Sequence, residues 1–257
     1  MLADYQQRFL KDLQRLKPLA GMRILEIGGD LRLDIARELI RLGAQLVWVV
    51  NLEEATNPEI ENERIKFFRS DAAEVSDLFP LNCFDIIVGC AVLEHIQDLP
   101  GVLSSVTKVL QPGGSIVLSG GPLWSSAKGH HLWLTIRGRE RRFNDDTSLL
   151  PDFAHLLHDS ASIGNALRDK FLSPEELERV AWEVYFRPYL SRQSKSSIIE
   201  QCDGCSGLQL QSLIEYRTPI EDHELKHRLG KVFGSRTGDC EVDEITVLLH
   251  KKTNASS

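Results

Sequence analysis

Two adjacent histidines follow a glycine pair, and their side chains are suited to moving a proton. His130 and His131 lie in the run GGPLWSSAKGHHLW, residues 120–133. A neutral imidazole can accept a proton near neutral pH and is the usual general base of enzymes. We therefore expect one of the two to be catalytic, while the other packs or caps the loop. The sequence does not choose between them.

The same loop and a second histidine pair carry side chains that could contact a polar substrate. The aromatic faces could stack on sugar rings, although packing in a core is an equal alternative for them. His155 and His158 would share one face of a helix. Acidic partners are not arranged around them, and Cys202 and Cys205 form a lone CxxC, so no metal site is predicted. The predicted substrate residues are Trp124, Ser125, Lys128, Trp133, His155 and His158.

A glycine turn near the N-terminus indicates a nucleotide. The sequence reads Leu-Glu-Ile-Gly-Gly-Asp over residues 25–30, where a short apolar run ends. Glycines at such a place let the backbone approach a bound nucleotide and enter a helix sharply. The run is not GxGxxG, so an NAD-linked dehydrogenase is disfavoured.

The apolar pattern predicts the elements that hold these residues. Continuous apolar runs, rather than alternating ones, indicate a parallel sheet that helices cover on both faces. Ligands of such sheets bind at the carboxyl ends of the strands. The expected strands are 23–28, 46–50, 65–68, 84–88 and 115–119, and the expected helices are 4–17, 33–42 and 99–110.

Beyond residue 121 the pattern changes. No strand is expected over residues 121–200, and the basic run 137–142 is expected to be a solvated loop. Ser173 and Glu176 form a capping box for a helix over 174–185, and a short helix is expected over 196–201. Strands are expected at 208–214 and 244–249, the last as an antiparallel edge strand. We expect one domain over 1–257, in which residues 121–205 form an insertion that covers the substrate.

The ordered motifs resemble those of the class I methyltransferase superfamily, which uses S-adenosyl-L-methionine. Asp71-Ala72 follows the third strand, FDIIVGCAVLEHI covers residues 84–96, and VLQPGGSIVLS covers residues 109–119. The resemblance covers about residues 20–120 well. It implies a doubly wound α/β fold with a mostly parallel seven-stranded sheet and a Rossmann-like topology. A helical lid would be inserted before the last two strands.

The resemblance also implies which residues meet the cofactor. They would line its amino-acid end (Glu26, Gly28, Gly29, Asp30), its ribose (Asn51), its adenine (Leu52, Asp71, Ala72) and its sulfonium (Cys90, Ala91). Asp30 and Arg32 stand where the family has its second and third glycines, and Asn51 stands where an acidic residue is usual. An amide offers one acceptor and one donor group to the ribose hydroxyls, so we predict weaker cofactor binding than the family norm.

The loop of GHHLW type resembles those of methyltransferases in glycan and surface-polysaccharide gene clusters. This implies O-methylation of a sugar or a glycan-related metabolite. The departures at Asp30, Arg32 and Asn51 keep an alternative open, a catalytically decayed member of the fold that binds a partner. Cofactor binding would discriminate between the two.

Composition and charge restrict the partners further. The net charge is −7, whereas a nucleic-acid binder usually has a basic surplus. The sequence has no basic leader followed by an apolar stretch, and no apolar run is long enough for a membrane helix. Five cysteines at irregular spacing fit a reducing compartment. We therefore expect a cytoplasmic protein without nucleic-acid or membrane partners, and a homodimer remains open.

Overall fold

The computed structural model describes residues 2–60 and 62–253, which divide into two compact units. The first unit contains the chain up to Gly120, Ile198–Ile214 and the chain from Thr246 onward. The second contains Gly121–Ser197 and Glu215–Ile245. Within the described ranges, no helix combines the length and the apolar character that a membrane span requires.

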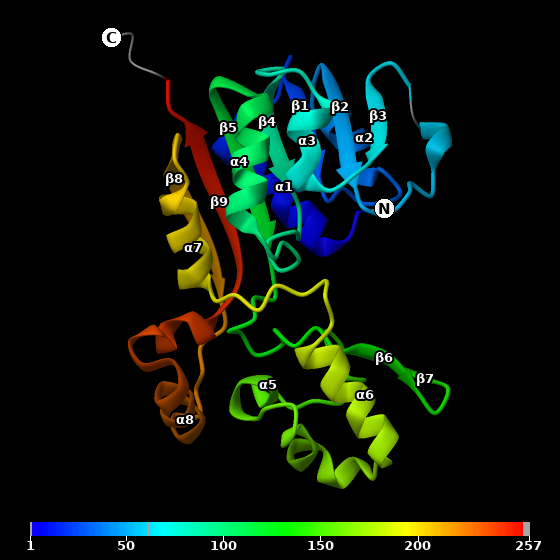
Figure 1. Ribbon diagram of the computed structural model, residues 1–257, viewed down its shortest axis with the longest axis vertical. Helices are drawn as coiled ribbons and strands as arrows, with labels where there is room; N and C mark the ends of the chain where they lie inside the picture. The colour runs from blue at the N-terminus through cyan, green and yellow to red at the C-terminus, as the bar shows by residue number, and fades with distance from the viewer. Residues whose placement is uncertain (1, 61, 254–257) are drawn as a thin grey trace. The chain divides into compact units, whose positions relative to one another are not determined.

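The helices and strands of the N-terminal half follow the predicted order, with the short helix α3 as an element that the sequence did not predict (Figure 1). They are α1 (Asp4–Leu16), β1 (Arg23–Ile27), α2 (Asp34–Arg41), β2 (Leu46–Asn51), β3 (Ile65–Arg69), α3 (Val75–Leu78), β4 (Phe84–Gly89), α4 (Leu99–Val109) and β5 (Leu110–Gly120). The C-terminal half contains β6 (Trp133–Ile136), β7 (Arg139–Arg142), α5 (Ala154–Leu157), α6 (Pro174–Tyr185), α7 (Lys195–Gly204), β8 (Leu208–Arg217), α8 (His223–Phe233) and β9 (Val242–Lys251).

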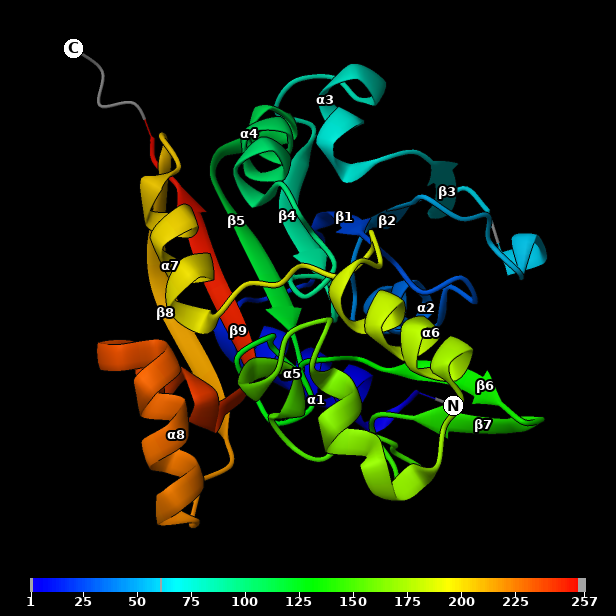
Figure 2. The same ribbon diagram turned by 60° about the horizontal axis from the view of Figure 1, so that its bottom comes forward.

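Seven strands form one sheet in the order β3-β2-β1-β4-β5-β9-β8. The strands β1 to β5 pair in parallel, and β9 runs opposite to β5 (Figure 2). This confirms the predicted doubly wound, mostly parallel sheet. The prediction that the last strand lies at the edge was wrong, because β9 lies between β5 and β8. Its core residues Ile245 and Val247 are fully buried, as expected for an inner strand, whereas most residues of β8 are only half buried.

Helices cover both faces of the sheet, as the apolar runs predicted. Phe9 and Leu13 of α1 and Leu39 of α2 pack with alternate strand residues in one buried cluster. The helix α4 lies on the opposite face (Figure 1). Four aromatic side chains, Trp48, Phe68, Phe79 and Phe84, form a second cluster.

The second unit corrects the expectation that residues 121–200 contain no strand. β6 and β7 form an antiparallel hairpin, in which Ile136 pairs with Arg139. Its turn residues Arg137 and Gly138 both have positive φ, 51° and 71°, as a two-residue type I′ turn requires. The basic run is therefore this turn and β7, not a solvated loop. The sequence missed the hairpin because each strand has only four residues and all four residues of β7 are charged.

The helix α6 lies beside this hairpin (Figure 2) and begins as predicted. The Ser173 N–H donates to Oε2 of Glu176 at 2.8 Å, and the Glu176 N–H donates to Oγ of Ser173 at 3.3 Å. Arg137 of the hairpin turn also forms an ion pair with Glu176 at 2.7 Å. The capping box therefore fixes both the start of the helix and its contact with the hairpin. A lid function for residues 121–205 stays a prediction.

The aromatic cluster yields a stability prediction. The Phe84 ring is buried and meets Trp48 and Phe79 edge to face, with centroids at 5.6 and 5.3 Å. We expect Phe84→Ala to lower the free energy of unfolding by about 3–5 kcal/mol, because it removes a large buried ring and leaves a cavity. Urea unfolding followed by tryptophan fluorescence measures this. The exposed Phe186 provides the control, since Phe186→Ala should change stability by less than about 0.5 kcal/mol. Equal effects of the two variants would contradict the prediction.

Candidate functional site

The residues predicted to bind the cofactor lie at the carboxyl ends of neighbouring parallel strands in the first unit. The strand order places β1 between β2 and β4, and β3 beside β2. The Gly28 N–H, just after β1, donates to the Val50 carbonyl of β2 at 2.8 Å. The Ser70 N–H, just after β3, donates to the Asn51 carbonyl at 3.0 Å. The sheet therefore brings the predicted nucleotide-binding segments to one edge.

Glu26 of β1 carries a buried carboxyl group. Its side chain is 1% exposed, and neither carboxyl oxygen makes a hydrogen bond of normal geometry within the described residues. Burial raises the pKa of Glu26 to about 8, the Asp30 carboxylate adds to the rise, and the Asp30 backbone offsets part of it. A buried polar group normally has a partner in the protein or in a ligand. The ammonium group of S-adenosylmethionine would supply a cation here, so Glu26 fits the expected cofactor.

The two glycines after β1 form a cradle that no larger residue could line. Gly28 has φ +63°, and a Cβ atom built on it would lie 2.6 Å from Cγ1 of Val92. A Cβ atom on Gly29 would lie 2.3 Å from Cγ1 of Val49. The backbone of this turn is therefore bare between two neighbouring strands, as the close approach of a nucleotide requires.

Asn51 fastens this turn to β2. Its Nδ2 donates to the Gly29 carbonyl at 2.6 Å, and its Oδ1 accepts from the Glu53 N–H at 3.0 Å. Only one Nδ2 hydrogen and one lone pair of Oδ1 therefore remain for ribose hydroxyls. Leu52, the next residue, is 53% exposed, which suits a side chain that packs on adenine. Both cofactor roles stay predictions.

Asp71 caps the short turn at residues 72–74. Its Oδ1 accepts from the Ala73 N–H at 2.9 Å. Its Oδ2 makes no hydrogen bond within residues 2–60 and 62–253. The capping bond orients the carboxylate next to Ala72, and the second oxygen can accept from an adenine amino group. The contact with adenine itself stays a prediction.

The segment after β4 is held in an unusual backbone conformation. Ala91 has φ +53°, which is uncommon for a residue other than glycine. Its N–H donates to Oγ of Ser119 at 3.1 Å, and the Val92 N–H donates to the Ser119 carbonyl at 2.9 Å. Ser119 of β5 therefore positions Cys90 and Ala91, a role that the sequence analysis missed. Strained backbone held by its surroundings is frequent at functional sites.

Tyr5 of α1 is a second residue that the sequence analysis missed. It is 44% exposed, and partial burial raises the pKa of its hydroxyl. The charges of Cys90, Asp30 and Glu94 raise this pKa further, so the hydroxyl lies within their electrostatic range. No sequence pattern marks Tyr5 as a site residue, because it occupies one of the apolar positions of an amphipathic helix.

Within the second unit, the two adjacent histidines have opposite hydrogen-bonding states. His130 is 0% exposed, and its Nδ1 accepts from the Leu132 N–H at 3.0 Å, so its proton is on Nε2. Burial lowers the pKa of His130 well below 6.5, and His155, Lys128 and His131 lower it further. His131 is buried, and its Nδ1 lies 3.0 Å from the Gly129 carbonyl. A carbonyl can only accept, so Nδ1 of His131 donates and the lone pair is on Nε2.

His155 packs against His130 and Trp124. Its Nε2 donates to the Trp124 carbonyl at 2.7 Å, and burial lowers its pKa to about 4. Its ring centroid lies 5.4 Å from that of His130. Nε2 of His130 and Nδ1 of His155 make no hydrogen bond within the described part of the chain. His155 is therefore a neutral residue of the interior of the second unit.

The other predicted substrate residues mostly contact the protein itself. Trp124 packs between His155 and Tyr185, and the Arg192 guanidinium lies 5.6 Å from its ring. The remaining contacts are Ser125 Oγ to the Asp239 carbonyl at 3.2 Å, Lys128 to Asp152 at 2.7 Å, Trp133 Nε1 to Glu140 at 2.7 Å, and Tyr185 to the His158 carbonyl at 2.7 Å. Both tryptophans therefore already contact the protein itself, and their substrate roles stay predictions.

Comparison with known proteins supports the motifs. The family described as "Methyltransferase domain" matches residues 1–184. A ubiquinone biosynthesis O-methyltransferase of Rhodopseudomonas palustris (strain BisA53) is 28% identical over 178 residues, which is 67% of this chain and 61% of that protein. The enzyme of the same name from Bradyrhizobium sp. (strain ORS 278) is 32% identical over 117 residues, 44% of this chain and 45% of that protein. The matches therefore span only about half the length of these relatives.

A solved structure shows the same fold. The S-adenosylmethionine-dependent methyltransferase of Mesorhizobium loti superposes with a TM-score of 0.58 and covers 97% of this chain and 99% of that chain. Its sequence identity to this chain is 16%, so the likeness concerns the fold alone.

The buried carboxyl of Glu26 yields a prediction about pH. Its pKa in the folded chain is about 8, above its ordinary 4.5, so the folded state holds this proton more tightly than the unfolded state. The stabilisation is complete below pH 4.5 and is lost as the pH rises toward 8, by about 1.4 kcal/mol for each pH unit between these values. The glutamine of Glu26→Gln stays neutral at every pH. The unfolding free energy of this variant should therefore rise relative to that of the wild type as the pH increases from 4.5 to 8.

Urea unfolding of both proteins at several pH values between 4.5 and 8 measures the difference. The exposed Glu63 supplies the matched control, since Glu63→Gln should follow the wild-type profile. Parallel profiles for Glu26→Gln and the wild type would show that the buried carboxyl does not hold a proton at neutral pH.

Proposed function

The chain belongs to the methyltransferase domain family, and from this membership we propose that it uses S-adenosylmethionine to methylate a hydroxyl oxygen of a small polar molecule. His131 acts as the general base. The observation that carries this proposal is the hydrogen bond from Nδ1 of His131 to the Gly129 carbonyl, because it leaves the lone pair on Nε2. A histidine base is oriented in this way by a carbonyl or carboxylate behind it.

His130 is less suited to this role. Its Nδ1 lone pair is already used by the Leu132 N–H, and its pKa lies well below 6.5 because it is buried. A base is most effective when its pKa is close to the working pH. The neutral His130 therefore acts as part of the packed interior of the second unit, next to His155.

Transfer to oxygen is supported by the relatives, which are named O-methyltransferases. A sugar acceptor has less support, because Trp124 already packs against His155 and Arg192 lies over its ring. The face of Trp133 is partly covered by Arg142, at 4.8 Å from the ring. We therefore define the acceptor by its hydroxyl group, and a phenol and a sugar are separate arms of the test.

The residues divide the reaction as follows. The cofactor supplies an electrophilic methyl group on a sulfonium sulfur. Glu26 and the glycine turn would hold its amino-acid end, and Asp71 would orient its adenine. His131 would take up the proton of the acceptor hydroxyl at Nε2. Positioning of the two reactants and removal of this proton are the contributions that a methyltransferase must make.

A substitution at His131 tests the proposal. Asparagine tolerates the positive φ of this position, 46°, and its amide can still donate to the Gly129 carbonyl. We expect His131→Asn to lower kcat by about 10²–10⁴-fold while the affinity for S-adenosylhomocysteine stays unchanged. The assay is release of S-adenosylhomocysteine from S-adenosylmethionine with catechols and with free sugars as separate acceptor sets.

The exposed His223 of α8 provides a matched control, because His223→Asn should keep the wild-type rate. An undiminished rate in His131→Asn would exclude His131 as the base. Tight cofactor binding without turnover on any hydroxyl acceptor would instead support the partner-binding module.

A further inference from the structure

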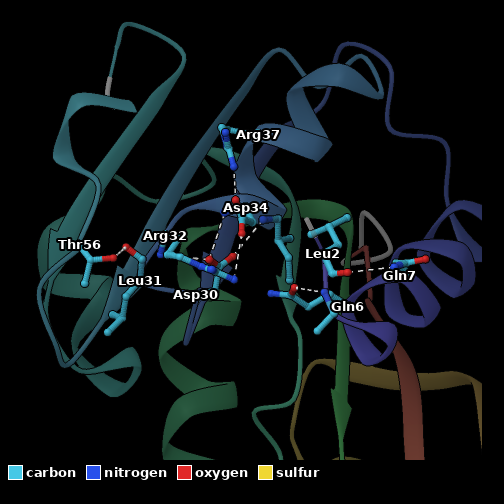
Figure 3. Close-up of polar contacts among 11 residues, drawn as sticks. Leu2, Gln6, Gln7, Asp30, Leu31, Arg32, Asp34, Arg37 and Thr56 are labelled. Carbon is cyan, nitrogen blue, oxygen red and sulfur yellow. Dashed lines mark hydrogen bonds and ion pairs between the residues drawn. The ribbon is translucent and has the colours of Figure 1, made fainter.

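The first N–H groups of α2, which could otherwise bind an anion, donate to the carboxylate of Asp30. The first N–H groups of a helix have no partner within the helix and attract negative charge. Oδ1 of Asp30 accepts from the Arg32 and Asp34 N–H groups, both at 3.1 Å, and Oδ2 accepts from the Ile35 N–H at 3.0 Å. Figure 3 shows the Asp30 carboxylate turned toward this backbone. These donors are therefore not available to a ligand.

A ligand that carries a positive and a negative charge nevertheless fits the adjacent turn. Glu26 is buried, its carboxyl oxygens have no hydrogen bond within the described residues, and Asp30 lies close enough to affect its charge. The amino-acid end of S-adenosylmethionine carries an ammonium and a carboxylate. Glu26 can pair with the ammonium, and the carboxylate then requires a cation or a set of N–H donors other than the helix N-terminus.

Arg32 is the cation nearest in sequence to this turn, and its charge is only partly neutralised. Its side chain is 63% exposed, and its guanidinium lies 3.4 Å from Oδ2 of Asp34. The other oxygen of Asp34 pairs closely with Arg37, so one carboxylate serves two arginines (Figure 3). The remaining N–H groups of Arg32 can form a fork with a second carboxylate.

A hydrogen bond and an ion pair tie Arg32 to the residues beside this turn: its N–H donates to the Asp30 carboxylate, and its guanidinium pairs with Asp34. Its charge acts on the hydroxyl of Tyr5, which also lies within range of Cys90, Asp30 and Glu94. Cys90 follows β4, at the strand edge where the sulfonium is expected. Arg32 is therefore held beside Asp30, in the turn that is predicted to meet the amino-acid end of the cofactor.

We propose that Arg32 binds the carboxylate of S-adenosylmethionine, in place of the helix N-terminus that Asp30 occupies. The two departures from the family's glycine pattern then compensate for each other: one closes the backbone anion site, and the other supplies a side-chain cation for the same group. The proposal concerns only the cofactor and is independent of the acceptor and of His131.

Calorimetric titration with two ligands tests this assignment. S-adenosylhomocysteine carries the amino-acid end, and 5′-methylthioadenosine has the same nucleoside and a thioether but no amino-acid end. We expect Arg32→Ala to weaken the binding of S-adenosylhomocysteine by about 10–100-fold, because it removes a charge-assisted pair, and to leave the binding of methylthioadenosine unchanged. Arg32→Lys should fall between the wild type and Arg32→Ala.

Arg37→Ala is the matched control, since Arg37 contacts the same Asp34 carboxylate from α2. Both of its affinities should stay within about twofold of the wild type. A rescue variant adds a second criterion: Asp30→Gly in the Arg32→Ala background frees the backbone donors and should restore several-fold of the lost affinity for S-adenosylhomocysteine.

Three results would overturn the assignment. The first is a wild-type affinity for S-adenosylhomocysteine in Arg32→Ala. The second is an equal loss for both ligands, which would indicate a damaged turn rather than a lost carboxylate contact. The third is the absence of S-adenosylhomocysteine binding by the wild-type chain.

Discussion

The close approach of the β1 turn to its two neighbouring strands is the constraint on which the cofactor half of the site depends. Added Cβ atoms at Gly28 and Gly29 would lie 2.6 and 2.3 Å from valine side chains after β4 and in β2. The turn can therefore be made only by residues without side chains. Because it lies against both neighbours, the ends of β1, β2 and β4 reach the same edge, and Glu26 is buried beneath that edge.

This burial gives the polar residues around the turn different roles. Asn51 and Asp30 find partners within the chain and thereby hold the β2 loop and the start of α2. The Glu26 carboxyl oxygens make no hydrogen bond of normal geometry within residues 2–60 and 62–253, and burial raises the pKa of Glu26 to about 8. Packing thus separates residues that shape the site from a buried carboxyl group that can pair with a ligand cation.

In the second unit, local backbone contacts make two adjacent and chemically identical side chains different. Leu132 donates to one imidazole and Gly129 accepts from the other, so His130 and His131 carry their protons on different nitrogens. Burial beside His155 then keeps His130 neutral. The contacts that orient these rings are made by residues only two positions away, but the burial that sets the pKa comes from the fold of the whole unit.

The sequence by itself determined the strands β1 to β5, the helices α1, α2 and α4, and the capping box of α6. Continuous apolar runs and Ser–Glu spacing are local signals, and the energies behind them act over a few residues. The order of motifs was also enough to indicate the family and its cofactor. The hairpin β6–β7 was not predicted, because its second strand consists of charged residues. The position of β9 was predicted wrongly, because a strand's place inside the sheet depends on its pairing with β8 and not on its own residue pattern.

Only the tertiary structure decided what the polar residues do. The family resemblance predicts Asp30 at the amino-acid end of the cofactor, but its carboxylate accepts from the first N–H groups of α2. Asn51, which is predicted to meet the ribose, also donates to the Gly29 carbonyl of the turn. Ser119 holds the Ala91 backbone, and the Tyr5 hydroxyl lies in the electrostatic range of Cys90, although no sequence pattern marks either residue. The physical reason is that a hydrogen bond or a pKa depends on distances and burial among residues from several elements, and a linear pattern contains neither.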